Sequence, residues 1–304
     1  TLSYLFTYLI LNKLKGRIRD LDRTRFGHKE QFSKILQNNT YDFILISYAY
    51  WAELINNNKH LNNAKLIIDT HDFLTSQFQN QKKFDLGKYF TKEIKTLNLF
   101  HKVLVISSDE NYVFSQFVKS EVITIPHALE SNFQIHSSPK KYDLVYVASG
   151  NEHNIKSAKW FFEEVYPKLD KNISICVVGK INEYLPELPN LTKLPFVEDL
   201  KEIYSDAKVA ICPMLTGTGL KIKVVEALSF GLPIVCNLRG IDGLLNKTNN
   251  GCLVANDAAT FSKHIEQLLA DNNFYEQQQN LAKNFFLNYL SIEVVYSELD
   301  KVFK

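Results

Sequence analysis

The chain has 304 residues, 45% of them hydrophobic, which is enough to bury more than one core and suggests about two domains. Its formal net charge of +2 gives no indication of a nucleic-acid partner. No apolar run reaches the length of a membrane-spanning helix. The four cysteines lie among apolar neighbours without a C-x-x-C pair, which favours buried thiols in the cytoplasm and no metal site.

The first residues combine an apolar run with a basic one. Residues 2–14 are almost continuously apolar, and residues 13–29 contain seven Lys or Arg. One interpretation is peripheral contact of residues 1–29 with an anionic membrane, at its inner face. We favour a core helix followed by a basic surface helix, since charge runs are usually solvated faces. The charges follow the apolar run, which argues against a secretory signal.

The first half alternates short apolar runs with segments of helical length. The runs are residues 43–47, 66–69, 103–107 and 122–125, and the alternation predicts a parallel α/β sheet. His71 and Asp72 directly follow the second run, so we expect them at the carboxyl edge of the sheet, where ligands bind. The alternative is a structural one, in which the pair caps the next helix.

A small polar segment, residues 137–141, is the best linker candidate. We therefore expect a first domain over residues 1–137, a second over 138–288, and a terminal helix over 289–304 that packs back on the first. In the second domain, a strand over 144–147 leads into Gly150 and Asn151, at a strand–helix turn suited to approaching a phosphate or sugar. Residues 257–270 have helical spacing.

Residues 208–236 predict the unit around which the second domain is organised. The strand over 208–212 precedes a loop with two glycines, residues 216–219, and then a helix that Gly231 and Pro233 end. Residues 232–236 predict the next strand. Glycines allow close backbone approach and a helix N-terminus attracts anions, so this loop is a candidate phosphate site.

Three charged side chains support that interpretation. We expect Lys221 and Lys223 in the first helical turn, where the helix dipole disfavours positive charge. Glu226 is three residues after Lys223, so both point to one region. A surface ion pair is the simpler alternative. A diphosphate held by the lysines, with Glu226 on the hydroxyls of an attached ribose, accounts for all three.

The run GTGLKIKVVEALSFGLPIV resembles the donor-sugar signature of the group 1 glycosyltransferases. The resemblance extends to YDLVYVASGNEHNIKSAKWFFEEVYP in the second domain and to IIDTHD and VLVIS in the first. It implies an α/β fold of GT-B type, with two Rossmann-like domains whose parallel sheets face a cleft. Many members carry a Glu eight positions before the ribose-binding Glu. Here Thr218 stands in that place, as in the glycine-loop variants.

The resemblance also implies site residues. Catalytic roles fall to His71, Lys221 and Lys223, and an acceptor-side role to Asp72. Donor-binding residues are those of the two glycine loops, the ribose contact and an apolar base contact: Gly150, Asn151, Phe196, Val197, Gly217, Thr218, Gly219, Leu220 and Glu226. Two lysines and a helix terminus can replace a divalent ion, so we expect no metal and no cofactor.

The resemblance implies a retaining glycosyltransferase of hexosyltransferase type. The donor would be a UDP- or GDP-linked sugar, and the acceptor a glycan or lipid-linked hydroxyl in bacterial-type polysaccharide or glycoconjugate synthesis. Two alternatives stay open. One is a non-catalytic protein that binds sugar nucleotides or glycans. The other is a GT-B-fold nucleotide-sugar epimerase, which needs an acid–base pair that the donor half does not clearly offer.

Overall fold

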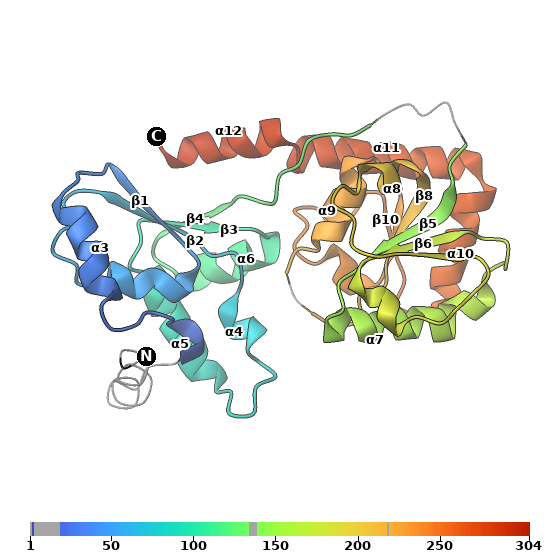
Figure 1. Ribbon diagram of the computed structural model, residues 1–304. Coiled ribbons are helices and arrows are strands. Elements are labelled where there is room, and N and C mark those ends of the chain that lie inside the picture. Colours follow the sequence, from blue (N-terminus) through green and yellow to red (C-terminus); the bar gives the residue numbers. More distant parts are fainter. Residues whose placement is uncertain (1, 3–18, 134–138, 218) are drawn as a thin grey trace. The chain divides into compact units, whose positions relative to one another are not determined.

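The computed structural model describes Leu2 and residues 19–133, 139–217 and 219–304 (Figure 1). The chain divides into two compact units. Unit 1 comprises Thr1–Ile125 and Leu299–Lys304, and unit 2 comprises Pro126–Glu298. Each unit has one sheet of parallel strands that alternate with helices along the chain, which confirms the predicted α/β class. Residues 3–18, most of the predicted apolar and basic segment, lie outside the described residues.

The sheet of unit 1 has the order β1-β2-β3-β4, so successive strands are neighbours. Its strands are β1 (Phe43–Ser47), β2 (Lys65–Asp69), β3 (Lys102–Val105) and β4 (Glu121–Thr124). Its helices are α3 (His28–Gln37), α4 (Leu74–Gln77), α5 (Leu86–Leu97) and α6 (Ser108–Phe117), with short 3-10 turns at Arg19–Leu21 and Ala49–Leu54. One core lies between strands and helices, where Ile46 and Ile68 pack with Phe114.

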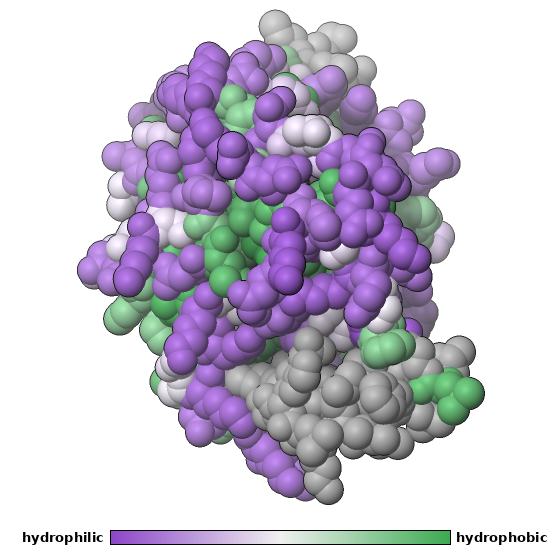
Figure 2. Space-filling view, turned by 90° about the vertical axis from the view of Figure 1, so that its left-hand side faces the viewer, coloured by the Kyte–Doolittle hydropathy of each residue, from purple (hydrophilic) through white to green (hydrophobic). Residues whose placement is uncertain are grey.

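The second face of this sheet has a smaller cluster. Ile67 and Leu104 pack there with Val302, from the last turn of the chain. β1 ends the strand order, and Leu45 on it is 45% exposed. The face of the molecule in Figure 2 has a patch of apolar residues framed by hydrophilic ones.

Unit 2 has a six-stranded sheet of order β10-β9-β8-β5-β6-β7. The strands are β5 (Tyr142–Val147), β6 (Ile175–Val178), β7 (Leu191–Leu194), β8 (Ala207–Cys212), β9 (Ile234–Cys236) and β10 (Cys252–Val254). The chain builds outward from β5 in one direction and then from β8 in the other. The carboxyl ends of β5 and β8 therefore form the topological switch point, where open α/β sheets bind ligands.

The helices of unit 2 follow the predicted pattern with shifted ends. They are α7 (Glu152–Trp160), α8 (Lys201–Ser205), α9 (Ile222–Ser229), α10 (Ala258–Ala270), α11 (Asn272–Tyr289) and the first part of α12 (Ile292–Val302), which from Leu299 on belongs to unit 1. A π-helical turn, Phe161–Val165, prolongs α7, and 3-10 turns span Tyr166–Lys168, Lys180–Tyr184 and Leu238–Ile241. β7 and β10 are short edge strands that were not predicted from the sequence.

Two glycines in unit 2 are fixed by geometry. Gly179 has φ 113°, and a Cβ there would lie 2.3 Å from the carbonyl oxygen of Ala148, so no other residue fits. This holds the turn after β6 against the turn after β5. Gly231 has φ 68° and follows Phe230, the C-cap residue of α9, as the predicted helix stop requires.

The chain passes from unit 1 to unit 2 between Ile125 and Pro126, ahead of the expected boundary at residues 137 and 138. The reason is that the following segment is bound by unit 2. The N–H of Leu129 donates to the carbonyl of Leu290 at 3.2 Å, and that of Asn132 to Ser229 at 2.7 Å. Of the predicted linker, residues 137 and 138 lie outside the described residues. At the other end, only Leu299–Lys304 group with unit 1.

All four thiols are free. Cys176, Cys212 and Cys236 are buried and Cys252 is half-buried, as the apolar neighbours predicted. Burial raises the pKa of the Cys176 thiol to about 11 and that of the Cys212 thiol to about 12. These thiols therefore act as small hydrophobic side chains at neutral pH.

Candidate functional site

The loop between β8 and α9 lies at the switch point of unit 2. Gly217 and Gly219 have φ of 94° and 78°, conformations that favour glycine. Thr218 lies outside the described residues. The hydroxyl of Thr216 is 2.9 Å from Nδ1 of His153, a residue of α7. That bond joins the glycine loop to the helix that follows β5, so the two switch-point loops form one site.

Lys223 is a half-buried cation in the first turn of α9. Its ammonium donates to Oδ1 of Asn154 at 3.0 Å and lies 5.1 Å from the ring centroid of Tyr146. Burial lowers the pKa of Lys223, while the neighbouring Cys212 and Glu226 raise it. An ammonium carries three donors. Asn154 is its hydrogen-bond acceptor in the described part of the chain, so the site has donor capacity for an anion.

Lys221 precedes the helix. We expected it in the first turn, but α9 begins at Ile222, and Lys221 is its N-cap residue with an extended backbone. Its ammonium donates to the carbonyl of Gly219 at 2.6 Å. Burial lowers the pKa of Lys221, and the Asp242 carboxylate raises it. Through this hydrogen bond Lys221 stabilises the conformation of the glycine loop. Leu220, next to it, is buried.

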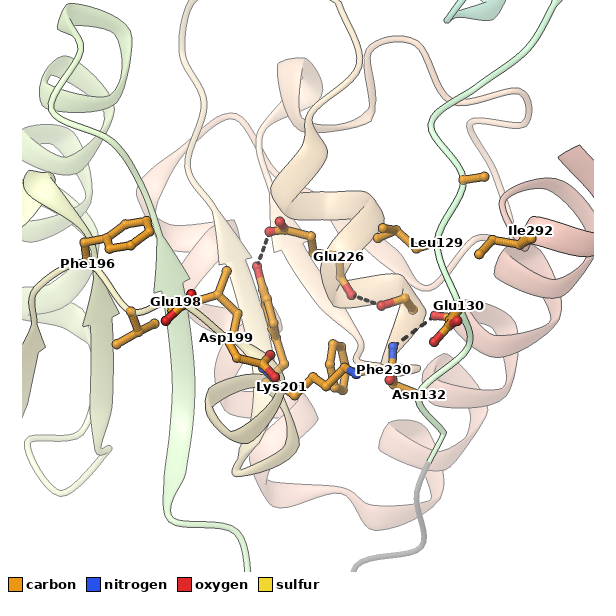
Figure 3. Close-up of a pocket in the computed structure, with 15 residues that line it drawn as sticks. Leu129, Glu130, Asn132, Phe196, Glu198, Asp199, Lys201, Glu226, Phe230 and Ile292 are labelled. Carbon is orange, nitrogen blue, oxygen red and sulfur yellow. Dashed lines mark hydrogen bonds between the residues drawn. The ribbon is translucent and has the colours of Figure 1, made fainter. Parts of the chain in front are cut away.

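A pocket of about 530 Å³ opens beside α9, lined entirely by unit 2 (Figure 3). Phe196, Val197 and Glu226 line the same pocket, so three residues predicted to bind one ligand are brought together. Phe196 is 79% exposed, which makes it a rim residue and not core. The remaining lining residues come from four segments: Ala128, Leu129, Glu130, Asn132, Glu198, Asp199, Leu200, Lys201, Tyr204, Ser229, Phe230 and Ile292.

Glu226 stands in the pocket wall. Its Oε2 accepts a hydrogen bond of 3.0 Å from the Tyr204 hydroxyl (dashed on Glu226 in Figure 3). Burial raises the pKa of Glu226, while the Tyr204 bond and Lys223 lower it. The alternative of a solvated surface pair with Lys223 is wrong, because Lys223 bonds to Asn154 and burial governs the pKa of both groups.

The loop after β5 has a clear structural role for one predicted residue. Asn151 is the N-cap of α7, and its Oδ1 accepts from the N–H of Asn154 at 2.9 Å. Its side-chain amide also donates to Ser149 at 3.0 Å. A Cβ on Gly150 would lie 3.3 Å from the Tyr184 ring, so the turn is tightly packed there. Asn151 thus positions Asn154, the partner of Lys223.

In unit 1, His71 lies at the carboxyl end of the sheet as expected. Its Nε2 is 2.8 Å from the Ser47 hydroxyl and 3.0 Å from Oδ2 of Asp69. Its ring stacks on Tyr48 at a centroid distance of 4.1 Å. Both His71 and Tyr48 have positive φ, 61° and 67°, a strained conformation that is concentrated at functional sites.

Asp72 does not cap the next helix. Burial raises its pKa, and His71 lowers it. Instead, the buried carboxylate of Glu93 caps α4: it accepts from the N–H groups of Leu74 and Thr75 at 2.9 and 2.8 Å and from the Thr75 hydroxyl at 2.6 Å. Burial raises the pKa of Glu93 to about 6 despite these bonds. Asp72 thus remains an acceptor-side candidate.

Sequence reasoning missed Tyr204, Asn154 and Tyr48 as contributors to the two sites. A tyrosine within a short amphipathic helix is typical of core, so nothing local marked Tyr204. Asn154 stands in the run that carried the family resemblance, which was the available signal. Within the described residues, no group of three or more His, Cys, Asp or Glu could hold a metal ion.

Comparisons with known proteins agree with this geometry. Residues 141–271, which include the glycine loop and α9, match the family model of group 1 glycosyl transferases. A Klebsiella pneumoniae protein, an uncharacterized 44.6 kDa protein in the cps region, is 24% identical over 268 residues, covering 78% of this chain and 68% of that protein.

Solved structures extend the similarity to the whole fold. An S. aureus TarM variant, solved with fondaparinux, α-GlcNAc-glycerol and UDP, matches with a TM-score of 0.64 and 16% identity over 91% of this chain. The chain spans 59% of that protein's length. Anabaena HepE in complex with UDP matches with a TM-score of 0.69 and 13% identity, over 90% of this chain and 81% of that protein. Sucrose-phosphate synthase from Thermosynechococcus elongatus matches with a TM-score of 0.69 and 16% identity, over 90% of this chain and 76% of that protein. The fold is therefore of GT-B type.

Proposed function

We propose that this protein is a glycosyltransferase that moves a hexose from a nucleoside diphosphate sugar to an acceptor hydroxyl, with retention of configuration. The observation that carries the proposal is the placement of Lys223 and Glu226 on one short helix at the switch point. Lys223 is a half-buried cation beside the glycine loop, and Glu226 lines the adjacent pocket of about 530 Å³. A nucleoside diphosphate needs a cation for its phosphates and, next to it, an acceptor for its ribose hydroxyls, and Lys223 and Glu226 provide these two groups.

The chemical role of the lysines follows from charge. Negative charge grows on the diphosphate as it leaves the sugar, and preorganised cations in a water-poor site stabilise that charge. Lys223 meets it directly with the N-terminus of α9, and Lys221 keeps the loop in place through Gly219. We therefore propose a metal-independent reaction, based on the cations that the loop provides.

The pocket provides for the nucleoside. Glu226 accepts hydrogen bonds from ribose hydroxyls, and the exposed ring of Phe196 with Val197 covers a base, UDP or GDP being the donor nucleotide. The match to the group 1 family and the UDP complexes of similar structures support this assignment. In unit 1, His71 and Asp72 are proposed to contact the transferred sugar and the acceptor.

The biological setting is proposed from one relative. The Klebsiella protein is named for the cps region, which supports a role in polysaccharide or glycoconjugate synthesis with a glycan or lipid-linked acceptor. In the part of the chain that the structure describes, no helix has both the length and the apolarity needed to cross a membrane. Contact of residues 1–29 with an anionic membrane from the cytoplasmic side stays a proposal, testable by co-sedimentation with phosphatidylglycerol vesicles.

Incubation with a panel of UDP- and GDP-sugars and glycan acceptors tests the function. We expect a glycoside product whose anomeric configuration, determined by NMR, equals that of the donor. An epimerised sugar nucleotide would identify an epimerase, and tight binding without turnover would identify a binding protein. Either result would contradict the proposal.

A further inference from the structure

The hydroxyl of Tyr204 forms a hydrogen bond to Glu226 at the wall of the pocket. Tyr204 comes from α8, is 2% exposed and still lines the nucleoside pocket. Its hydroxyl lies 3.0 Å from Oε2 of Glu226 and 3.5 Å from the carbonyl oxygen of Lys223. A hydroxyl has one proton to donate, and the shorter contact to the carboxylate takes it.

The tyrosine ring is held independently of this bond. It stacks on Phe230 with a centroid distance of 5.3 Å and an interplanar angle of 24°. Phe230 is itself a wall of the pocket (Figure 3). The hydroxyl therefore has a fixed position, and the Glu226 carboxylate is anchored at one oxygen.

The anchored carboxylate has capacity left. An ionised carboxylate accepts about four hydrogen bonds over its two oxygens. Tyr204 takes one position on Oε2 and is the hydrogen-bond partner of this carboxylate within the described residues. Oε1 therefore has acceptor positions for a pair of ligand donors, and the Tyr204 bond fixes the plane in which they must lie.

We infer that Tyr204 is a positioning residue that orients Glu226 toward the vicinal hydroxyls of a ribonucleoside. The inference rests on the proposed function and deepens it. It makes the preference for ribose over deoxyribose depend on a residue that acts through Glu226. Without the hydroxyl, the carboxylate can rotate, and each ligand hydroxyl must then order it on binding.

The substitution Tyr204→Phe removes the hydroxyl and keeps the ring stacked on Phe230. Calorimetric titration with UDP, 2′-deoxy-UDP, GDP and 2′-deoxy-GDP gives the ribose preference as a ratio of Kd values. We expect on the order of tenfold preference for the ribonucleotide in the wild type and less than about threefold in the variant. Binding of the deoxynucleotides should change little.

Tyr275→Phe is the matched control. The Tyr275 hydroxyl donates to the carbonyl of Lys208 at 3.1 Å, in the same unit but outside the pocket lining. The Tyr275→Phe variant loses one hydrogen-bonded hydroxyl and should keep the wild-type ratio of Kd values. A second readout needs no nucleotide: the Tyr204 bond lowers the pKa of Glu226, so its carboxyl carbon, followed by NMR, should titrate at higher pH in Tyr204→Phe.

The outcomes separate the two claims. An unchanged ribose preference in Tyr204→Phe, or an equal loss for ribo- and deoxynucleotides, would overturn the positioning role and leave the proposed function standing. A wild-type chain that binds neither UDP nor GDP would overturn the proposed function, and this inference with it.

Discussion

Two carboxylates, a buried one in unit 1 and a half-buried one in unit 2, differ in how many of their hydrogen-bond acceptor positions the fold occupies. Glu93 in unit 1 accepts three hydrogen bonds from two consecutive residues of α4, and it is 2% exposed. Glu226 in unit 2 accepts one bond from Tyr204 and borders a pocket. Burial raises the pKa of both groups.

The comparison separates structural from functional burial. A carboxylate that the fold saturates stabilises the fold, since removing it leaves buried donors without acceptors. A carboxylate whose acceptor positions face a pocket is completed by a ligand. A raised pKa alone does not distinguish these roles. The number of carboxylate acceptor positions that accept hydrogen bonds from the protein does.

Glu93→Ala should have the largest effect on stability. It leaves the N–H groups of Leu74 and Thr75 and the Thr75 hydroxyl without their acceptor inside unit 1. We expect a loss of about 4 kcal/mol in the free energy of unfolding, measured by urea denaturation. A loss of less than about 1 kcal/mol in the free energy of unfolding would mean that water replaces the carboxylate as acceptor. The hydrogen bonds of Glu93 would then not be needed for stability.

Lys223→Ala should have the largest effect on turnover. The ammonium is proposed to meet charge that develops in the transition state, and one such electrostatic group is worth on the order of 3 kcal/mol, a hundredfold or more in kcat. Binding of the free nucleoside should change little. Lys159→Ala is the control, since this lysine of α7 forms an exposed pair with Glu163. Near wild-type kcat in Lys223→Ala would remove this residue from the mechanism.

Glu226→Ala gives the opposite profile to Glu93→Ala. We expect about tenfold weaker donor binding, loss of the ribose preference, and a loss of about 1 kcal/mol in the free energy of unfolding, because one buried hydroxyl, that of Tyr204, loses its acceptor. Paired calorimetry and urea denaturation on the two variants test the comparison directly. A large loss of stability in Glu226→Ala would return Glu226 to a structural role.

Glu110 extends the comparison to pH. Burial raises its pKa to about 7, bonding from the Ile106 N–H lowers it, and the Asp72 and Glu93 charges raise it. The folded state therefore keeps a proton that the unfolded state loses above its ordinary value of 4.5. Unfolding free energy should fall by about 1 kcal/mol from pH 5.5 to 6.5, since the unfolded state binds fewer protons there. In Glu110→Gln that slope should flatten, and an identical slope in both proteins would contradict the assignment.

The smallest expected effect is that of chelation. The glycine loop has Lys221 and Lys223 beside a helix N-terminus, which meets the charge of a diphosphate without a divalent ion. Excess EDTA in a transfer assay should change the rate by less than about twofold. Abolished activity that magnesium or manganese restores would show that the phosphates lie elsewhere.

The sequence predicted the parts of the fold that local patterns encode. The apolar β-branched runs predicted the four strands of unit 1, and β1 has the bounds that were expected. The glycine loop, Lys223 and Glu226 were found together because one helix places them. What it could not give were contacts between distant segments: the cap of α4 comes from Glu93, and the anchor of Glu226 comes from α8. Capping rules describe neighbours in sequence, so neither partner had a local signal.

The four thiols offer a way to watch one unit alone. Every cysteine of the chain belongs to unit 2, and three are buried. A maleimide can reach Cys212 or Cys236 only when that unit opens, so the labelling rate under native conditions reports the free energy of opening. Added nucleotide would slow labelling in proportion to its saturation of the folded state. The rate of thiol labelling therefore reports donor binding to unit 2 and does not respond to events confined to unit 1.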